Sequence, residues 1–140
     1  MGKIKSSLNF VNYIVDNVEF YSNPKCTEKV FDIDFDIDSE VNYVNDSNFL
    51  VTLYVKIFED ADKNGYPFSM KIKLTGAFKV ENVNEDTKQV FAEKNSVAIL
   101  FPYVRALVST YTSASNVQPV ILPPINVVNY LQNKKENKNK

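Results

Sequence analysis

Residues 97–132 read VAILFPYVRALVSTYTSASNVQPVILPPINVVNYLQ, and this stretch does most to decide the fold. In its first half, apolar side chains recur at the i, i+3, i+4 and i+7 spacing of a single helix face. The pattern predicts a long helix from about Ser96 to Ser113. Pro102 comes early in it, where its ring would kink the first turns or mark the true start. The residues of this apolar face are Val97, Leu100, Phe101, Val104, Leu107, Val108 and Tyr111.

The second half of the stretch is an extended run interrupted by prolines, from Gln118 to Pro124. Residues 126–132 can then form a short C-terminal helix, and the polar residues 133–140 are expected to be a disordered tail. Neither half holds a pair of side chains suited to acid–base chemistry. The apolar and aromatic surface therefore indicates binding rather than catalysis, and part of it is expected to be shared with another subunit or a client.

The first half of the chain alternates with the period of two that is typical of β-strands. An interruption near Asp16 and Asn17 predicts a bulge in the first strand. Gly76 predicts a bulge or a close backbone approach in the fourth. Strands followed by helices predict an α+β fold, with a four-stranded antiparallel sheet, a long helix and a short C-terminal helix in one domain over residues 1–132. The predicted strands are 8–21, 31–38, 49–58 and 66–83.

Four carboxylates occupy one face of the predicted second strand. Phe31, Ile33, Phe35 and Ile37 alternate with Asp32, Asp34, Asp36 and Asp38. Neighbouring carboxylates on that face lie about 7 Å apart. One interpretation is a solvated face that discourages edge aggregation, with Lys71, Lys73 and Lys79 of another strand offsetting the charge. The other is a docking strip for a basic partner, and the pattern leaves both open.

The composition argues against enzymes, metal proteins and nucleic-acid-binding proteins. The 140 residues contain no histidine, one cysteine (Cys26) and a net charge of -1. The commonest general base and metal ligand is therefore missing, and we expect no catalytic residues, no metal and no cofactor. The segment from Asp60 to Gly65 resembles the start of a calcium loop. Lys71 occupies the position that needs a bidentate glutamate, so we interpret the segment as a hairpin turn.

The N-terminal sequence MGKIKSSLNFVNYIV holds no apolar run that would make a signal peptide or a membrane span. Asn9, Asn12 and Asp16 interrupt it. We therefore expect a cytoplasmic protein without direct membrane insertion.

Several short motifs, taken together, are similar to those of a known protein family. The run Ile99-Leu-Phe-Pro-Tyr103, then Arg105, the apolar stretch from Pro119 to Asn126, and Asn129-Tyr-Leu-Gln132 follow in this order. Gly76-Ala-Phe78 lies in the fourth strand. Over residues 8–132 the chain resembles the SecB protein-export chaperone family, and the ILFPY helix is the most specific part of the likeness.

The resemblance implies an ATP-independent chaperone that holds unfolded precursor proteins in apolar grooves. It implies a homotetramer, a dimer of dimers, with long helices packed between two sheets. It also implies delivery to the SecA translocation ATPase, which would dock on the acidic outer face of the sheet. The groove residues would be Phe31, Tyr103, Val120, Leu122, Val128 and Tyr130. The docking residues would be Asp34, Asp36 and Asp38, and the oligomer helix would use Leu100, Val104, Leu107, Val108 and Tyr111.

The chain departs from the family pattern at the docking positions. The acids that the family carries on the first strand align with Asn17 and Tyr21, and the acid on the fourth strand aligns with Lys71. The segment between Asn126 and Asn129 is also shorter and lacks a groove phenylalanine. Two hypotheses follow, a general export chaperone and a SecB-like chaperone dedicated to one client, such as an antitoxin, without SecA.

Overall fold

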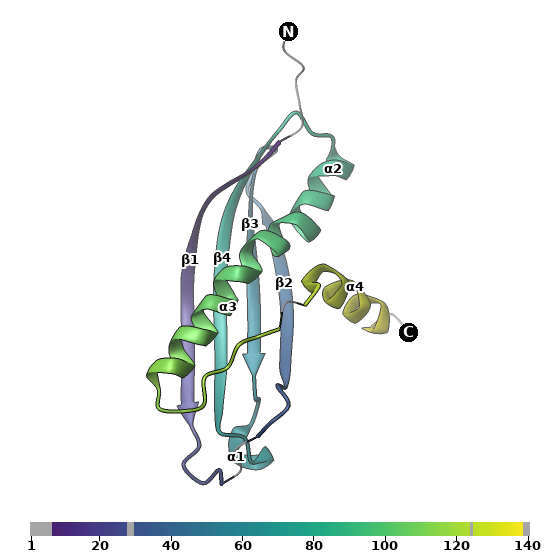
Figure 1. Cartoon of the computed structure of the whole chain (residues 1–140). Coiled ribbons are helices and arrows are strands. Elements are labelled where there is room, and N and C mark those ends of the chain that lie inside the picture. Colours follow the sequence, from purple (N-terminus) through teal and green to yellow (C-terminus); the bar gives the residue numbers. More distant parts are fainter. Residues whose placement is uncertain (1–6, 28–29, 124, 139–140) are drawn as a thin grey trace.

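One antiparallel sheet with helices on one face makes up the protein (Figure 1). The computed structural model describes residues 7–27, 30–123 and 125–138. The architecture confirms the predicted α+β fold. The elements are β1 (Ser7–Ser22), β2 (Phe35–Tyr43), β3 (Asn48–Ile57), α1 (Ala61–Asn64), β4 (Phe68–Glu81), α2 (Glu85–Val90), the π-helical turn η1 (Phe91–Asn95), α3 (Ser96–Ala114) and α4 (Val127–Lys138).

The strand order is β1-β4-β3-β2, so β3 and β4 are central and β1 and β2 form the two edges. Side chains alternate strictly along β4. Phe68, Met70 and Leu74 are at most 1% exposed and face the helices, whereas Lys71 and Lys73 between them face solvent. This alternation gives the sheet a buried helix side and a polar outer face.

Edge strand β1 contains two irregularities. Its register with β4 shifts between Phe10 and Asn12, and again between Val15 and Asn17. The second shift confirms the bulge predicted near Asp16. The first was missed, because the apolar Val11 at that point does not mark an interruption. The whole stretch 11–17 is exposed, so this edge lacks a cover within the described chain.

The second strand is displaced along the chain to Phe35–Tyr43, and the prediction that it begins near Phe31 is wrong. The ladder with β3 begins at the pair Phe35 and Ile57. Beyond Ile57, Phe58 takes a positive φ of 53°, which turns β3 away from its neighbour. One further bond follows, from the Phe58 N–H to the Asp34 carbonyl (2.9 Å). Asp36 and Asp38 therefore lie on a strand, and Asp34 lies just before it.

The predicted turn from Asp60 to Gly65 contains one helical turn, α1. Asp60 and Gly65 both adopt left-handed conformations, with φ of 53° and 72°. The two strands that flank it are therefore joined by a compact connection rather than by a tight two-residue hairpin.

The long helix begins well before the predicted Ser96. Helices α2, η1 and α3 follow one another without a gap from Glu85 to Ala114, giving a 30-residue helix. The Asn84 side chain caps the start by accepting from the Thr87 N–H (2.7 Å). Pro102 lies inside α3 and does not mark its start. Among the described residues, no helix is both long and apolar enough to cross a membrane.

Gly76 allows α3 to lie close to the sheet, which agrees with the second of the two alternatives predicted for it, a bulge or a close approach. A Cβ at this position would stand 2.5 Å from Leu100 Cδ2 and 2.9 Å from a ring carbon of Phe78. Leu100 itself is fully buried. The absence of a side chain at residue 76 therefore sets the closest approach of helix and sheet.

The chain then returns across the helix side of the sheet to α4, which lies beside β2 (Figure 1). Thr112 Oγ1 accepts from the Val120 N–H (2.9 Å), and Arg105 Nε donates to the Leu122 carbonyl (3.0 Å), so both residues tie this crossover to α3. Helix α4 continues to Lys138, where the sequence predicted a disordered tail from residue 133. Pro124 and residues 139–140 lie outside the described residues.

Candidate functional site

Two of the predicted groove residues share one apolar hollow. Phe31 and Val120 line a space of about 250 Å³ between the segment before β2 and the crossover. Val30 and Ile121 stand at the same hollow and are 88% and 71% exposed. Phe31 is held edge-on against the rings of Phe58 and Tyr66. The hollow is therefore a preformed apolar surface with an exposed rim.

Sequence reasoning missed Val30 and Ile121 in this hollow. The signal for Ile121 was present, because it belongs to the apolar run between two prolines. Val30 had no signal of its own, since it precedes the alternating segment and meets the crossover only in the folded chain. Ile33 and Phe68 complete the apolar wall.

Leu122 and Tyr103 lie away from this hollow. Leu122 is 2% exposed and belongs to the core. Tyr103 projects from α3 over β1, where its ring lies 4.4 Å from that of Tyr13 and 5.7 Å from that of Phe10. The six predicted groove residues thus do not form one continuous surface within a single chain.

The two predicted groove residues of α4 have different surroundings. Val128 lines a separate hollow of about 240 Å³ between α3 and α4, together with Phe101 and Pro102. The Tyr130 ring packs against that of Phe35, with centroids 5.6 Å apart. Its hydroxyl turns toward the aspartates of β2.

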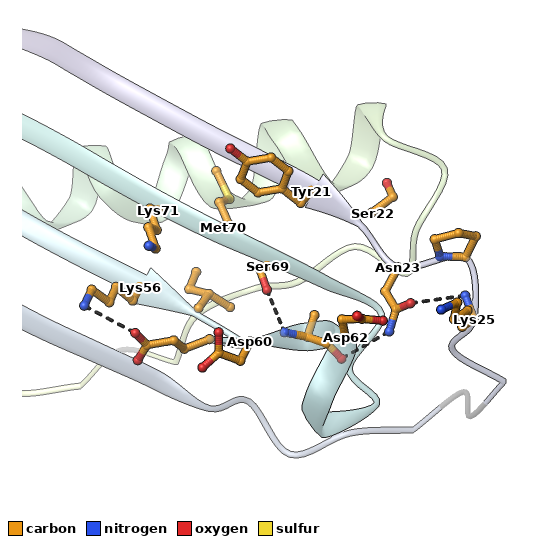
Figure 2. Close-up of a pocket in the computed structure, with 14 residues that line it drawn as sticks. Tyr21, Ser22, Asn23, Lys25, Lys56, Asp60, Asp62, Ser69, Met70 and Lys71 are labelled. Atoms are coloured by element: carbon orange, nitrogen blue, oxygen red, sulfur yellow. Dashed lines mark hydrogen bonds and ion pairs between the residues drawn. The ribbon is translucent and has the colours of Figure 1, made fainter.

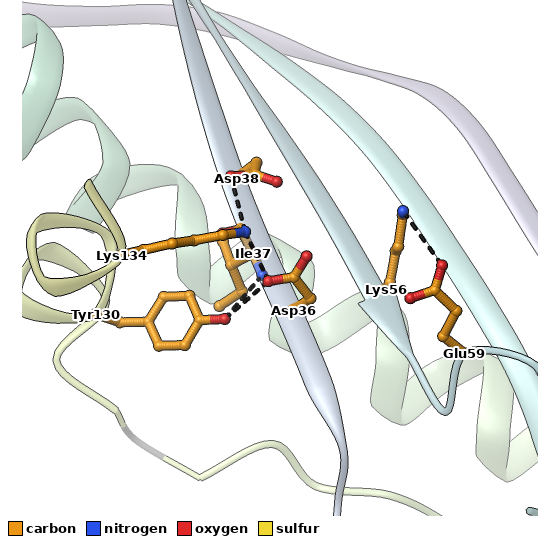
Figure 3. Close-up of polar contacts among 7 residues, drawn as sticks. All are labelled: Asp36, Ile37, Asp38, Lys56, Glu59, Tyr130 and Lys134. Atoms are coloured by element: carbon orange, nitrogen blue, oxygen red, sulfur yellow. Dashed lines mark hydrogen bonds and ion pairs between the residues drawn. The ribbon is translucent and has the colours of Figure 1, made fainter. Parts of the chain in front are cut away.

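The predicted docking aspartates already have partners in their own chain (Figure 3). Lys134 Nζ lies 2.6 Å from Asp36 Oδ1 and 2.8 Å from Asp38 Oδ1. The Tyr130 hydroxyl donates to Asp36 Oδ1 (3.0 Å). Asp34 accepts from the Tyr66 hydroxyl (3.3 Å). Lys134 was not predicted as a functional residue, because it was assigned to a disordered tail.

These contacts alter the acidity of the groups involved. Burial on its own raises the pKa of Asp36, but hydrogen bonds from Lys134 and Tyr130 outweigh it and leave the pKa below its ordinary value. Burial likewise lowers the pKa of Lys134, yet the hydrogen bonds to Asp36 and Asp38 leave the pKa above its ordinary value. Both groups are therefore charged across the neutral range.

The centre of the outer face is basic. Lys71 on β4 stands directly opposite Lys56 on β3, and Lys73 follows two residues along. Lys56 pairs with Glu59 (3.4 Å). The register places Asn17 and Tyr21 on the same face of β1. Glu19 lies between them and stands opposite Lys71, so the row of neighbouring acids is on β2 and a single acid of β1 faces the basic centre.

A hollow of about 370 Å³ with a mixed apolar and charged lining lies at the α1 end of this face (Figure 2). Lys25, Lys56 and Lys71 line it together with Asp60 and Asp62. Ser69 Oγ accepts from the Ala61 N–H (2.9 Å) and donates to the Phe58 carbonyl (2.7 Å), so this hydroxyl is engaged in holding α1. Sequence reasoning missed this hollow, which combines charges of both signs.

Three of the five predicted interface residues of the long helix face their own sheet. Leu100, Val104 and Val108 are fully buried in the single chain. Leu107 is half-buried and Tyr111 is 38% exposed. The apolar helix face that the sequence displayed is therefore mostly used inside the protomer, and only its flank remains for another subunit.

Known proteins are similar to this chain over most of its length. A family model described as preprotein translocase subunit SecB matches residues 11–138. An uncharacterized protein of Methanocaldococcus jannaschii is 43% identical, over 94% of this chain and 87% of that protein. The protein-export protein SecB of Bartonella bacilliformis is 29% identical over 75% of this chain, and the match spans 65% of that protein's length.

Among solved structures, the fold is similar to that of the Mycobacterium tuberculosis Rv1957 SecB-like chaperone, determined in complex with a ChAD peptide from the Rv1956 HigA1 antitoxin. The TM-score is 0.65 at 16% sequence identity, with 84% of this chain and 87% of that chain covered. At this identity the likeness concerns the fold alone.

Proposed function

Because the chain belongs to the SecB family, we propose that it acts as an ATP-independent chaperone that binds unfolded precursor proteins and keeps them competent for Sec-dependent export. The observation that carries this proposal is the family match across residues 11–138. Family members of this kind are not enzymes. The apolar hollow at Phe31 and Val120 supports the proposal physically. It offers preformed apolar area with little demand on client sequence.

Self-association into a homotetramer, a dimer of dimers, is part of the proposal. The exposed stretch of β1 supports it, because Val11 and Ile14 are both 63% exposed on a sheet edge that no other described strand pairs with. Such an edge is a template for pairing with another chain. Tyr13 and Tyr103 extend the apolar surface from β1 onto α3. A second copy would bury this surface, and we place the assembled chaperone in the cytoplasm.

A specific observation favours the second candidate function, a SecB-like chaperone dedicated to one client without SecA. Lys56 and Lys71 stand side by side at the centre of the outer face. Like charges directly opposite one another repel, and they would also repel a basic docking domain. The remaining aspartates of β2 could still dock SecA, so that partner stays a candidate.

Client binding at the apolar hollow can be tested in an aggregation assay. We expect the purified protein to suppress aggregation of an unfolding substrate without nucleotide. Ile121→Asp should weaken this suppression at least several-fold, because it puts a charge into the apolar rim. Val90→Asp is the matched control, since Val90 is 45% exposed on α2, away from the hollow. Equal activity of both variants would contradict this client site, and no suppression by the wild type would contradict both chaperone functions.

A pull-down separates the two chaperone functions. The wild-type protein should retain the C-terminal region of SecA from the same host if it serves general export. Retention of a single client without SecA would instead favour the dedicated chaperone. Capture from cell extract reports clients and translocase in one experiment.

A further inference from the structure

Two side chains of α4 cap the backbone of Ile37 on the edge of β2 that faces away from β3. Tyr130 and Lys134 are one helical turn apart and so lie on the same helix face. The Tyr130 hydroxyl accepts from the Ile37 N–H (3.4 Å), and Lys134 Nζ donates to the Ile37 carbonyl (3.2 Å). Both contacts reach Ile37 from the side of β2 away from β3, as Figure 3 shows. They satisfy backbone groups that an added strand would use.

The same two side chains neutralise the acidic positions on either side of Ile37. Asp36 and Asp38 alternate with it and therefore project to the outer face. Lys134 bridges both carboxylates, at 2.6 Å and 2.8 Å. Glu40 continues the acidic row and accepts from the Tyr54 hydroxyl (3.0 Å). One lysine of α4 thus occupies the position that a basic side chain of a docked strand would take.

Little else holds the C-terminal half of α4 in place. Val127 and Leu131, its buried residues, both lie in the first half. From Gln132 onward, Lys134 is the one described residue that is not exposed. Lys135 adds a loose ion pair to Glu93 (3.9 Å) between exposed groups. Ion pairs open to solvent contribute little, so this half of the helix can detach without disturbing the core.

We propose that the C-terminal half of α4 is an internal competitor for the β2 edge. While it is docked, its Lys134 occupies the Ile37 carbonyl and both aspartates, whereas Tyr130 on the Ile37 N–H belongs to the first half of the helix and stays in place. When it detaches, the freed carbonyl and aspartates accept an extended peptide segment that carries basic residues at alternate positions. This inference rests on the docking role proposed for the aspartates and adds a closed state to it.

Binding of a defined peptide tests the competition. The probe is a fluorescein-labelled synthetic peptide in which Lys and Val alternate, and the control peptide alternates Glu and Val. Full-length wild type, Lys134→Gln and Lys138→Gln are compared by fluorescence anisotropy. Lys138 is exposed at the end of the same helix, so its variant makes the same change in net charge without touching β2.

We expect Lys134→Gln to bind the Lys–Val peptide about three- to tenfold more tightly than the wild type, because the competing helix is released. Lys138→Gln should leave the affinity within about twofold. Adding Asp36→Asn to Lys134→Gln should remove the gain. Amide hydrogen exchange along residues 132–138 should be faster in Lys134→Gln than in the wild type, because the contacts of Lys134 with β2 are removed.

Equal affinities of wild type and Lys134→Gln would overturn the competition while leaving the docking role intact. The same gain with Lys138→Gln, or with the Glu–Val peptide, would also overturn it. If the Lys–Val peptide binds to none of the variants, the docking role of the aspartates fails and this inference fails with it.

Discussion

The two edge strands of the sheet, β1 and β2, differ in how their outward backbone groups are covered. Each edge strand presents backbone N–H and C=O groups that can pair with another chain. On β1 the stretch 11–17 is exposed and carries large apolar side chains. On β2 the acids are paired and Ile37 is capped by α4. Among the described residues, the stretch 11–17 of one edge is thus left exposed, whereas the other edge is capped at Ile37 by its own chain.

Both edge strands belong to a sheet whose central strands, β3 and β4, pack against α3. Leu100→Ala should lower the free energy of unfolding by about 3 kcal/mol, because it removes fully buried methyl groups from the helix–sheet contact. Leu107→Ala, at a half-buried position, should cost clearly less. Urea denaturation of both variants measures the difference, and equal losses would contradict the packing described for α3.

Gly76 allows a sharper test of the same contact. Gly76→Ala should cost about 1–3 kcal/mol, because its Cβ would meet the Leu100 side chain. In a Leu100→Ala background the cost should be smaller, since the nearest clashing atoms are gone. A double-mutant cycle measures this coupling. Strictly additive losses would show that the close approach lies elsewhere.

A charged side chain on the exposed edge of β1 should oppose self-association at that edge. Ile14→Lys should weaken self-association at least tenfold, which corresponds to about 1.4 kcal/mol, because lysine on an exposed edge opposes strand pairing. Val90→Lys places the same charge on α2 as a control. Sedimentation velocity over a concentration series measures the oligomer. An unchanged mass for Ile14→Lys would remove β1 from the proposed interface.

Removing the charge of Asp36 should destabilise the contact between α4 and β2. Asp36→Asn should destabilise the docked end of α4 by roughly 0.5–1 kcal/mol, since the pair with Lys134 is partly open to solvent. Asp32→Asn lies outside β2 and should have no comparable effect. Amide hydrogen exchange along residues 132–138 reports the change. Protection that stays the same in both variants would argue against the clamp.

The smallest expected effect is a pH dependence of the same clamp. The pKa of Asp36 is lowered in the folded chain, so its contribution is present above the ordinary aspartate pKa of about 3.9 and is lost as pH falls through the lowered value. The pKa of Lys134 is raised, so its contribution is lost only as pH rises above about 10.4. Hydrogen exchange of the α4 end should therefore accelerate only toward both extremes, after correction for intrinsic exchange rates. Asp36→Asn should flatten the acid limb, and an identical acid limb in that variant would assign the effect to another group.

The strands and the long helix could be predicted because their signals are local. The alternation along Phe68 to Leu74 and the apolar spacing from Val97 to Val108 reflect burial on one side of each element. The β2 boundary could not be predicted in this way. Phe31 and Ile33 continue the alternation, but the partner strand turns away after Ile57, so the ladder ends there.

The candidate site was predicted less completely than the fold. The sequence named Phe31 and Val120, which share a hollow, but it also named Leu122, which the core buries. Apolarity by itself does not distinguish a side chain that fills the core from one that lines a surface hollow. Lys134 was missed because a run of Lys and Asn is typical of a disordered tail.

By itself, the sequence determined the α+β class, the four strands, the helix that covers them and the family to which the chain belongs. These depend on side-chain periodicity and on short motifs, which are properties of neighbouring residues. Only the tertiary structure decided how the two sheet edges differ. Lys134 and Asp36 are separated by 98 positions in the chain, and their contact depends on how α4 packs beside β2. Such a contact depends on the path of the whole chain, and no local pattern encodes it.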